Sequence, residues 1–131
     1  MSKNSQPKFK FFYTGIRVRE LERSIDFYTK IFGMKVTRKG TMPHGGKYVA
    51  LRTPGSTREL ELNWYPTGSR FYTKYTRGEE LDHLAFIVDD VEAAYNDLRK
   101  KGVKVAVSPR QSEGTEVYLQ DPDGIWIELL S

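Results

Sequence analysis

The pattern of apolar residues changes along the first half of the chain between one typical of strands and one typical of helices, and each change marks the start of an expected element. Residues 11–18 (FFYTGIRV) are rich in residues that favour strands. The next segment carries four apolar residues at spacings of four, three and four, namely Leu21, Ile25, Tyr28 and Phe32. That spacing predicts a helix with one buried face, and Gly33 is expected to end it. Three further strands are predicted after it, over residues 34–39, 47–53 and 59–65.

The second half of the chain shows the same succession of patterns. A strand is predicted over residues 82–88 (DHLAFIV), followed by a helix over DDVEAAYNDLRKKG with an apolar stripe. Asp89 and Glu92 have the spacing of a capping box at the start of this helix. Three strands are again expected after the helix, at 103–107, 116–120 and 125–130, with the turn DPDG between the last two.

The two halves therefore read as tandem repeats of one βαβββ unit. An offset of 70 residues places Val18 on Val88 and Leu21 on Val91, and the ends of the units align as LEL on IEL. A repeat of this kind predicts an α+β fold of two tandem βαβββ units, in which curved mixed sheets carry helices on the outside. We expect a disordered tail over 1–8 and a single domain over 9–131. Its units span 11–65 and 82–130 and are joined by a linker at 66–81.

Composition narrows the function classes. The chain has 131 residues and no cysteine, which excludes disulfides, thiol catalysis and thiolate metal sites. The net charge of +4 is scattered along the chain, so a nucleic-acid partner is not expected. No apolar run reaches the length of about 18 residues that a membrane helix needs, and the polar start MSKNSQPK lacks the apolar run of a secretory signal. We therefore expect a cytoplasmic protein with a small-molecule substrate.

Strand parity brings candidate metal ligands to one side of the predicted sheets. Because the side chains of alternate strand residues face opposite sides of the sheet, the side chain of His83 faces away from the side that carries Leu84 and Phe86. The same parity turns two glutamates, Glu61 and Glu128, away from the helices and into a cavity, together with Asn63 and Trp126, which we expect to contact the substrate. The repeat makes Glu61 and Glu128 equivalent, and it makes Tyr13 equivalent to His83. Paired buried carboxylates are costly, and a divalent ion bound by imidazole and carboxylates removes that cost.

Three segments resemble the glyoxalase I family, within the vicinal oxygen chelate superfamily. They are RVRELERSIDFYTKIFGMKV, DHLAFIVDDV and DPDGIWIELL, and the resemblance covers about residues 11–130. It implies a vicinal oxygen chelate fold with four metal ligands on the inner strands. His83 and Glu128 match the third and fourth ligands. Glu61 matches the second by the repeat, whereas the family's spacing of this ligand, four residues before an Asn-Trp pair such as Asn63-Trp64, would select Glu59.

The first ligand departs from the family pattern. The family has a histidine where this chain has Tyr13, which either ligates the metal, hydrogen-bonds a metal-bound water or marks a different reaction. The other histidine, His44, stands in the loop GTMPHGG. It is either exposed or able to swing over the cavity as a metal ligand, a catalytic base or a contact to the substrate. The resemblance implies zinc or nickel as the metal, with manganese, cobalt or iron as alternatives.

The resemblance implies lyase or isomerase chemistry on a hemithioacetal formed from a 2-oxoaldehyde and a thiol. The metal polarises vicinal oxygens, while Glu128, with Glu61 as a symmetric second, moves a proton between carbons. Arg17 matches an arginine that contacts the carboxylate of the thiol cofactor, and a homodimer is expected. Two alternatives stay open. The first is a metal-free binding protein of the bleomycin-resistance type. The second is an extradiol dioxygenase, which needs two histidines and a carboxylate, whereas the predicted strands of this chain supply only one histidine.

Overall fold

The computed structural model of the chain describes residues 8, 11–43, 45–69, 71–78, 81, 83–111 and 117–131. The tail expected over residues 1–8 lies outside these ranges except for residue 8, and His44 lies outside them too. The first unit consists of β1 (Tyr13–Arg17), α1 (Leu21–Phe32), β2 (Lys35–Thr41), β3 (Lys47–Arg52) and β4 (Glu59–Trp64). The second consists of β5 (Leu84–Ile87), α2 (Val91–Lys100), β6 (Lys104–Val107), β7 (Tyr118–Gln120) and β8 (Trp126–Leu130).

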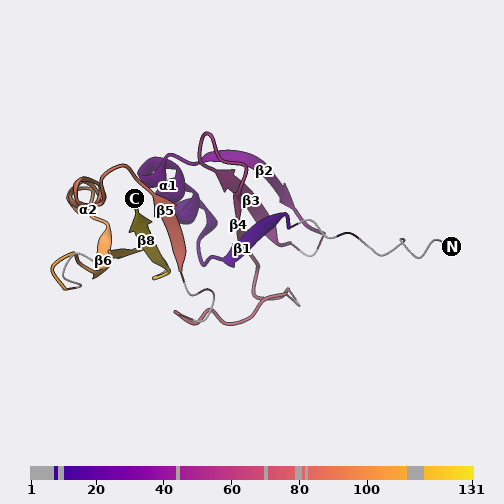
Figure 1. Cartoon of the computed structure of the whole chain (residues 1–131). Coiled ribbons are helices and arrows are strands. Elements are labelled where there is room, and N and C mark those ends of the chain that lie inside the picture. The colour runs from indigo at the N-terminus through magenta and orange to yellow at the C-terminus, as the bar shows by residue number, and fades with distance from the viewer. Residues whose placement is uncertain are drawn as a thin grey trace.

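The two units form separate sheets (Figure 1), and each sheet is mixed, has four strands and shares the topology of the other. The strand orders are β1-β4-β3-β2 and β5-β8-β7-β6, with β1 parallel to β4 and β5 parallel to β8. The registers match as well, because Gly15 pairs with Glu61 and Ala85 pairs with Glu128. The structure thus confirms the predicted fold class and its internal repeat, and it makes Glu61 the structural counterpart of Glu128.

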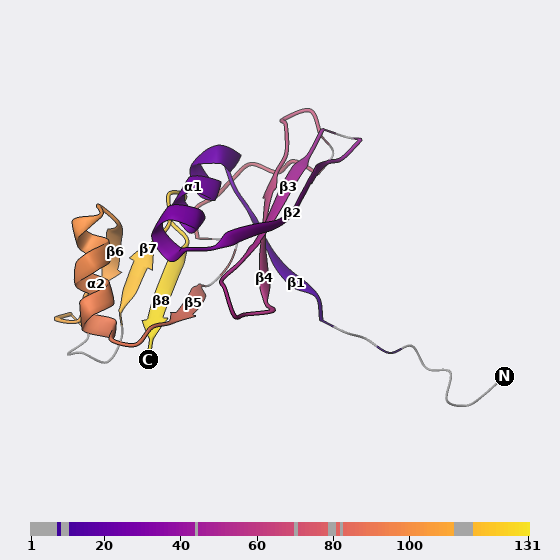
Figure 2. The ribbon, with the colours of Figure 1, turned by 90° about the horizontal axis from the view of Figure 1, so that it is seen from above.

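Helix α1 lies between the two sheets and packs on both of them (Figure 2). The predicted apolar face of this helix is confirmed, because Tyr28 is fully buried and packs in one cluster with Leu62 of β4 and Ile127 of β8. Phe32 stacks on Phe86 of β5 at a ring distance of 4.2 Å. The helix ends where predicted, since Gly33 adopts a left-handed φ of 67° and donates its amide to the Tyr28 carbonyl.

Helix α2 covers the second sheet but starts one residue later than its predicted cap implies. The N-cap is Asp90, whose carboxylate accepts a hydrogen bond from the Ala93 amide at 3.1 Å. The capping box predicted at Asp89 is therefore wrong. The alignment of the two repeats indicates Asp90 as the N-cap of α2, because Asp90 aligns with Glu20, the N-cap of α1. Within the described residues, neither helix has the length and apolar character to cross a membrane.

Both sheets turn their apolar faces toward the helices, which decides where their polar faces lie. Leu60 and Leu62 of β4 pack toward α1, as do Ile127 of β8 and Ile125, which directly precedes that strand. Because the two sheets share α1 as a packing partner, their opposite faces point away from each other. Those opposite faces carry every described candidate for metal binding, so the fold separates the candidates into two groups.

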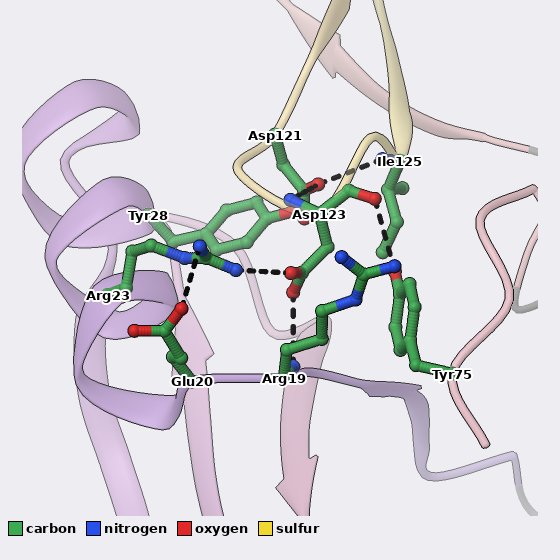
Figure 3. A network of polar contacts seen from close by, with 8 residues as sticks. All are labelled: Arg19, Glu20, Arg23, Tyr28, Tyr75, Asp121, Asp123 and Ile125. Carbon is green, nitrogen blue, oxygen red and sulfur yellow. Dashed lines mark hydrogen bonds and ion pairs between the residues drawn. The ribbon is translucent and has the colours of Figure 1, made fainter. Parts of the chain in front are cut away.

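A buried polar network ties the DPDG turn of the second unit to the first unit (Figure 3). The Asp123 carboxylate is fully buried, pairs with the guanidinium of Arg23 on α1 and accepts the Arg19 amide. The Tyr28 hydroxyl donates to Asp121 at 2.9 Å, and burial raises the pKa of Tyr28 well above its ordinary value. Burial likewise raises the pKa of Asp121. These contacts join residues that are 93 to 104 positions apart in the sequence and hold the two units in one arrangement.

Two candidate half-sites

The first half-site lies on the polar face of the first sheet, where Tyr13 and Glu61 meet. Glu61 is only 6% exposed. The negative charge of Glu61, together with burial and a hydrogen bond from the phenol, raises the pKa of Tyr13 above its usual value. Tyr13 is therefore a protonated phenol near neutral pH and donates to Glu61. Of the four residues predicted to bind metal, these two are brought together here.

Two residues that the sequence analysis did not single out, Thr37 and Arg38, also reach this half-site. The Thr37 hydroxyl donates to Glu59 at 2.6 Å, and this bond is the main cause of a lowered pKa at Glu59. The Arg38 guanidinium donates to Glu59 through Nε at 3.1 Å and to Glu61 through Nη2 at 3.2 Å. Both glutamates therefore lie on one face, as their shared parity predicted.

A β-bulge explains why parity could not reveal this pair. The register of β2 against β3 shifts between Val36 and Arg38, so adjacent residues Thr37 and Arg38 both reach Glu59 instead of facing opposite sides. A bulge adds one residue to a strand and breaks the alternation of faces. No motif around Arg38 signals this irregularity, and only the three-dimensional pairing of β2 with β3 shows it.

The second half-site lies on the polar face of the second sheet. His83 Nε2 is 3.2 Å from Glu128 Oε1, and both side chains are partly exposed. The imidazole meets the ring of Tyr118 edge-on at 5.5 Å, and Tyr118 lies 5.4 Å from the ring of Trp126. The sequence analysis did not name Tyr118, which pairs with Glu128 in the register of β7 with β8. Alternation within the predicted strand at 116–120 shows which residues share a face, but not which residue of the next strand each one meets.

Among the described residues, the candidate metal ligands gather in two separate groups, Tyr13 with the two glutamates of β4 and His83 with Glu128. Across the described residues, no three His, Asp or Glu side chains gather as a metal-binding group. The sequence had left open whether one chain or two would complete the site. The shared packing of both sheets on α1 keeps the Tyr13–Glu61 pair apart from the His83–Glu128 pair.

A pocket of about 540 Å³ adjoins the first half-site, beneath the segment that was predicted as a linker. Arg17 and Asn63, both predicted to bind substrate, line it beside Glu61. Arg17 donates to the Phe71 carbonyl at 2.9 Å and lies over the ring of Tyr65. The linker contributes further residues to the wall of the pocket, which were not predicted from the sequence, namely Thr73, Lys74, Tyr75 and Thr76. With Arg17 and Lys74 in its wall, the pocket suits a ligand with an anionic end.

The fold and the two half-sites define a class of protein, and sequence comparison identifies the same class. The sequence profile of the Glyoxalase/Bleomycin resistance protein/Dioxygenase superfamily matches residues 10–129. The chain belongs to this superfamily.

Individual relatives narrow the class. A probable lactoylglutathione lyase from Synechocystis is 34% identical over 126 residues, covering 90% of this chain and 92% of the relative. The glyoxalase I of Leishmania major, described as trypanothione-dependent, superimposes with a TM-score of 0.76 at 38% identity, covering 95% of this chain and 87% of that one. The antibiotic-binding protein TnmS3 from Streptomyces has a TM-score of 0.68 at 26% identity, covering 95% of this chain and 97% of that protein. The chain is a lactoylglutathione lyase-like enzyme.

Proposed function

We propose that the protein isomerises the hemithioacetal of a 2-oxoaldehyde and a thiol, as a metal-dependent glyoxalase I. The observation that carries this proposal is the pairing of His83 with Glu128 on a face equivalent to the one that bears Tyr13 and Glu61. Relatives named lactoylglutathione lyase that match nearly the whole chain support the same reaction.

The side chains fit a divalent metal ion. Two ligand atoms that share one ion at bond lengths of about 2.0–2.2 Å lie about 3 Å apart, close to the 3.2 Å between His83 Nε2 and Glu128 Oε1. In the other half-site, the carboxylates of Glu59 and Glu61 share the single guanidinium of Arg38, which leaves net negative charge on a largely buried pair. His83, Glu128 and Glu61 would hold the ion, with Tyr13 as the fourth ligand or as a donor to its water.

The complete site is proposed to form between two copies of the chain, the first half-site of one copy facing the second half-site of the other. The separation of the two half-sites within one chain supports this arrangement. So do the exposed apolar side chains beside them, since Ile87 of β5 is 84% exposed and Phe12, just before β1, is 65% exposed. Strands β1 and β5 each lie at the edge of their sheet, where a second copy can approach.

Each residue then has a chemical role. A bound ion would supply Lewis acidity to the neighbouring oxygens of the substrate. Glu128 is the proposed base, which takes a proton from one carbon and returns it to the next, with Glu61 as the symmetric alternative. Arg17 and Asn63 are proposed to hold the polar end of the thiol in their pocket. Trp126, which is partly exposed beside Tyr118, is proposed to pack on the substrate.

Metal-free binding of a small molecule is a second candidate, favoured by one specific observation. Tyr13 replaces the usual histidine, and Glu61 already receives hydrogen bonds from Tyr13 and Arg38. The likeness to an antibiotic-binding protein agrees with this reading.

Turnover and metal content of the purified protein separate the two functions. We expect conversion of methylglyoxal with glutathione or trypanothione after loading with zinc or nickel. Glu61→Gln, His83→Ala and Glu128→Gln should each lower metal occupancy, and Glu59→Gln should lower it less than Glu61→Gln. The reverse order for the two glutamates would make Glu59 the ligand. A protein that neither binds metal nor turns over any thiol adduct would favour the binding function.

Restoring the histidine that the family has at position 13 should tighten metal binding. A neutral imidazole is a better ligand near pH 7 than a phenol whose pKa is raised by a neighbouring carboxylate. Titration of zinc, nickel and cobalt into wild type and Tyr13→His should show about a tenfold or larger gain in affinity. An unchanged affinity would place Tyr13 outside the metal's coordination.

A further inference from the structure

Arg38 occupies an unusual position, because its charged group lies between two carboxylates and is surrounded by aromatic rings. Nη2 is 3.0 Å from Glu59 Oε1 and 3.2 Å from Glu61 Oε2. The guanidinium carbon lies 5.0 Å from the ring centre of Phe12, 5.1 Å from that of Tyr13 and 5.8 Å from that of Tyr48. The ring faces attract a cation at such distances, so the three rings help to hold the guanidinium of Arg38 in place.

The two carboxylates hold Arg38 unequally. Glu59 accepts a hydrogen bond from Nε of Arg38, forms an ion pair with Nη2 and is itself fixed by the Thr37 hydroxyl. Glu61 receives Nη2 alone, in addition to the Tyr13 hydroxyl. Glu59 therefore anchors the guanidinium, whereas the contact with Glu61 is single and can be given up without releasing Arg38 from its place.

The charges of the assembled site balance only when Arg38 is counted. Three carboxylates would surround the proposed metal, those of Glu59, Glu61 and Glu128. With the one positive charge of Arg38, their sum is −2, which a divalent ion neutralises. Without Arg38, the site would carry an excess negative charge and attract a divalent ion more strongly.

From this arrangement we propose that Arg38 is a positioning residue that holds Glu61 in the metal-free chain and competes with the metal ion for it. The inference rests on the proposed function, since it concerns the same half-site. Arg38 keeps the buried carboxylate compensated before the ion arrives, and it stays anchored on Glu59 when Glu61 turns to the ion. Its charge thereby lowers the affinity for the metal, which keeps metal binding reversible.

The test measures metal affinity directly, by competition of Zn²⁺ between the full-length protein and a chromophoric chelator. Arg38→Met removes the charge and is expected to lower the apparent Kd for Zn²⁺ by about tenfold or more. Lys39→Met is the matched control, because Lys39 is the next residue of β2, is exposed and also loses one positive charge. The control should stay within about threefold of wild type. Arg38→Lys retains the charge and is expected to stay close to wild type as well.

Each outcome decides the proposal. Tighter binding by Arg38→Met, or binding by this variant when wild type binds none, supports it. Equal or weaker binding by Arg38→Met, with wild type still binding metal, overturns the competition and leaves the proposed function standing. No metal binding by any variant overturns both. If Arg38→Met does not fold, as judged by circular dichroism, Arg38→Gln serves as the neutral variant because its amide still reaches for Glu59.

Discussion

Co-expression of Glu61→Gln and Glu128→Gln chains is expected to restore about a quarter of wild-type lyase activity, although each variant alone should be nearly inactive. Removal of a general base or of a metal ligand lowers turnover by about 10²–10⁴-fold. Recovery follows if each site takes one half from each copy. A mixed dimer then contains one site with both defects and one site with neither, and random pairing makes about half of the dimers mixed.

The geometry behind this expectation is the orientation of the two polar faces. Tyr13 and Glu61 lie on one sheet, while His83 and Glu128 lie on the other, and both sheets pack their apolar faces on α1. Because the two halves point apart within one chain, the proposed site would need a second copy to complete it.

The matched control pairs two variants that both damage the second half-site. Co-expression of His83→Ala with Glu128→Gln should restore no activity, because every site then contains a damaged second half-site. Initial rates at equal total protein, with dimer composition checked by tagged chains, measure both mixtures. Recovery in neither mixture would show that one chain builds the whole site or that the site lies elsewhere.

Asp123→Ala is expected to lower the free energy of unfolding by about 2–4 kcal/mol, far more than the loss of a surface ion pair. The Asp123 carboxylate is 0% exposed, pairs with Arg23 and accepts the Arg19 amide (Figure 3). Its removal leaves that amide without an acceptor and leaves Arg23 without its buried partner, at the junction of the two units.

Urea unfolding followed by fluorescence and circular dichroism measures this change. Asp97→Ala is the control, because Asp97 forms an exposed ion pair with Lys101 at 3.0 Å within one helix turn. Such surface pairs contribute only about 0.3–0.5 kcal/mol. If both variants lost the same small amount, the Asp123 network would not be what stabilises the junction between the units.

The sequence by itself determined the local structure and the repeat. Periodicity is set by which side chains must be buried, so the helix of Leu21 and Tyr28 and the face of Glu61 and Glu128 could be derived from spacing alone. The repeat also identified Glu61 and Glu128 as counterparts, and the matching registers of β4 and β8 agree. Where a boundary was misplaced, as at Asp89, the error was one residue, because neighbouring acidic residues are equally suitable caps.

The tertiary structure decided which of these residues meet. Parity states the side of a sheet on which Glu61 lies but not the direction in which that sheet faces, which depends on α1 packing between both sheets. The bulge in β2 brings Thr37 and Arg38 to Glu59, and a broken alternation cannot be inferred from a regular period. The Asp123–Arg23 pair likewise joins residues that are distant in the chain. Contacts of this kind depend on how whole elements pack, and the sequence pattern of each element describes only its own faces.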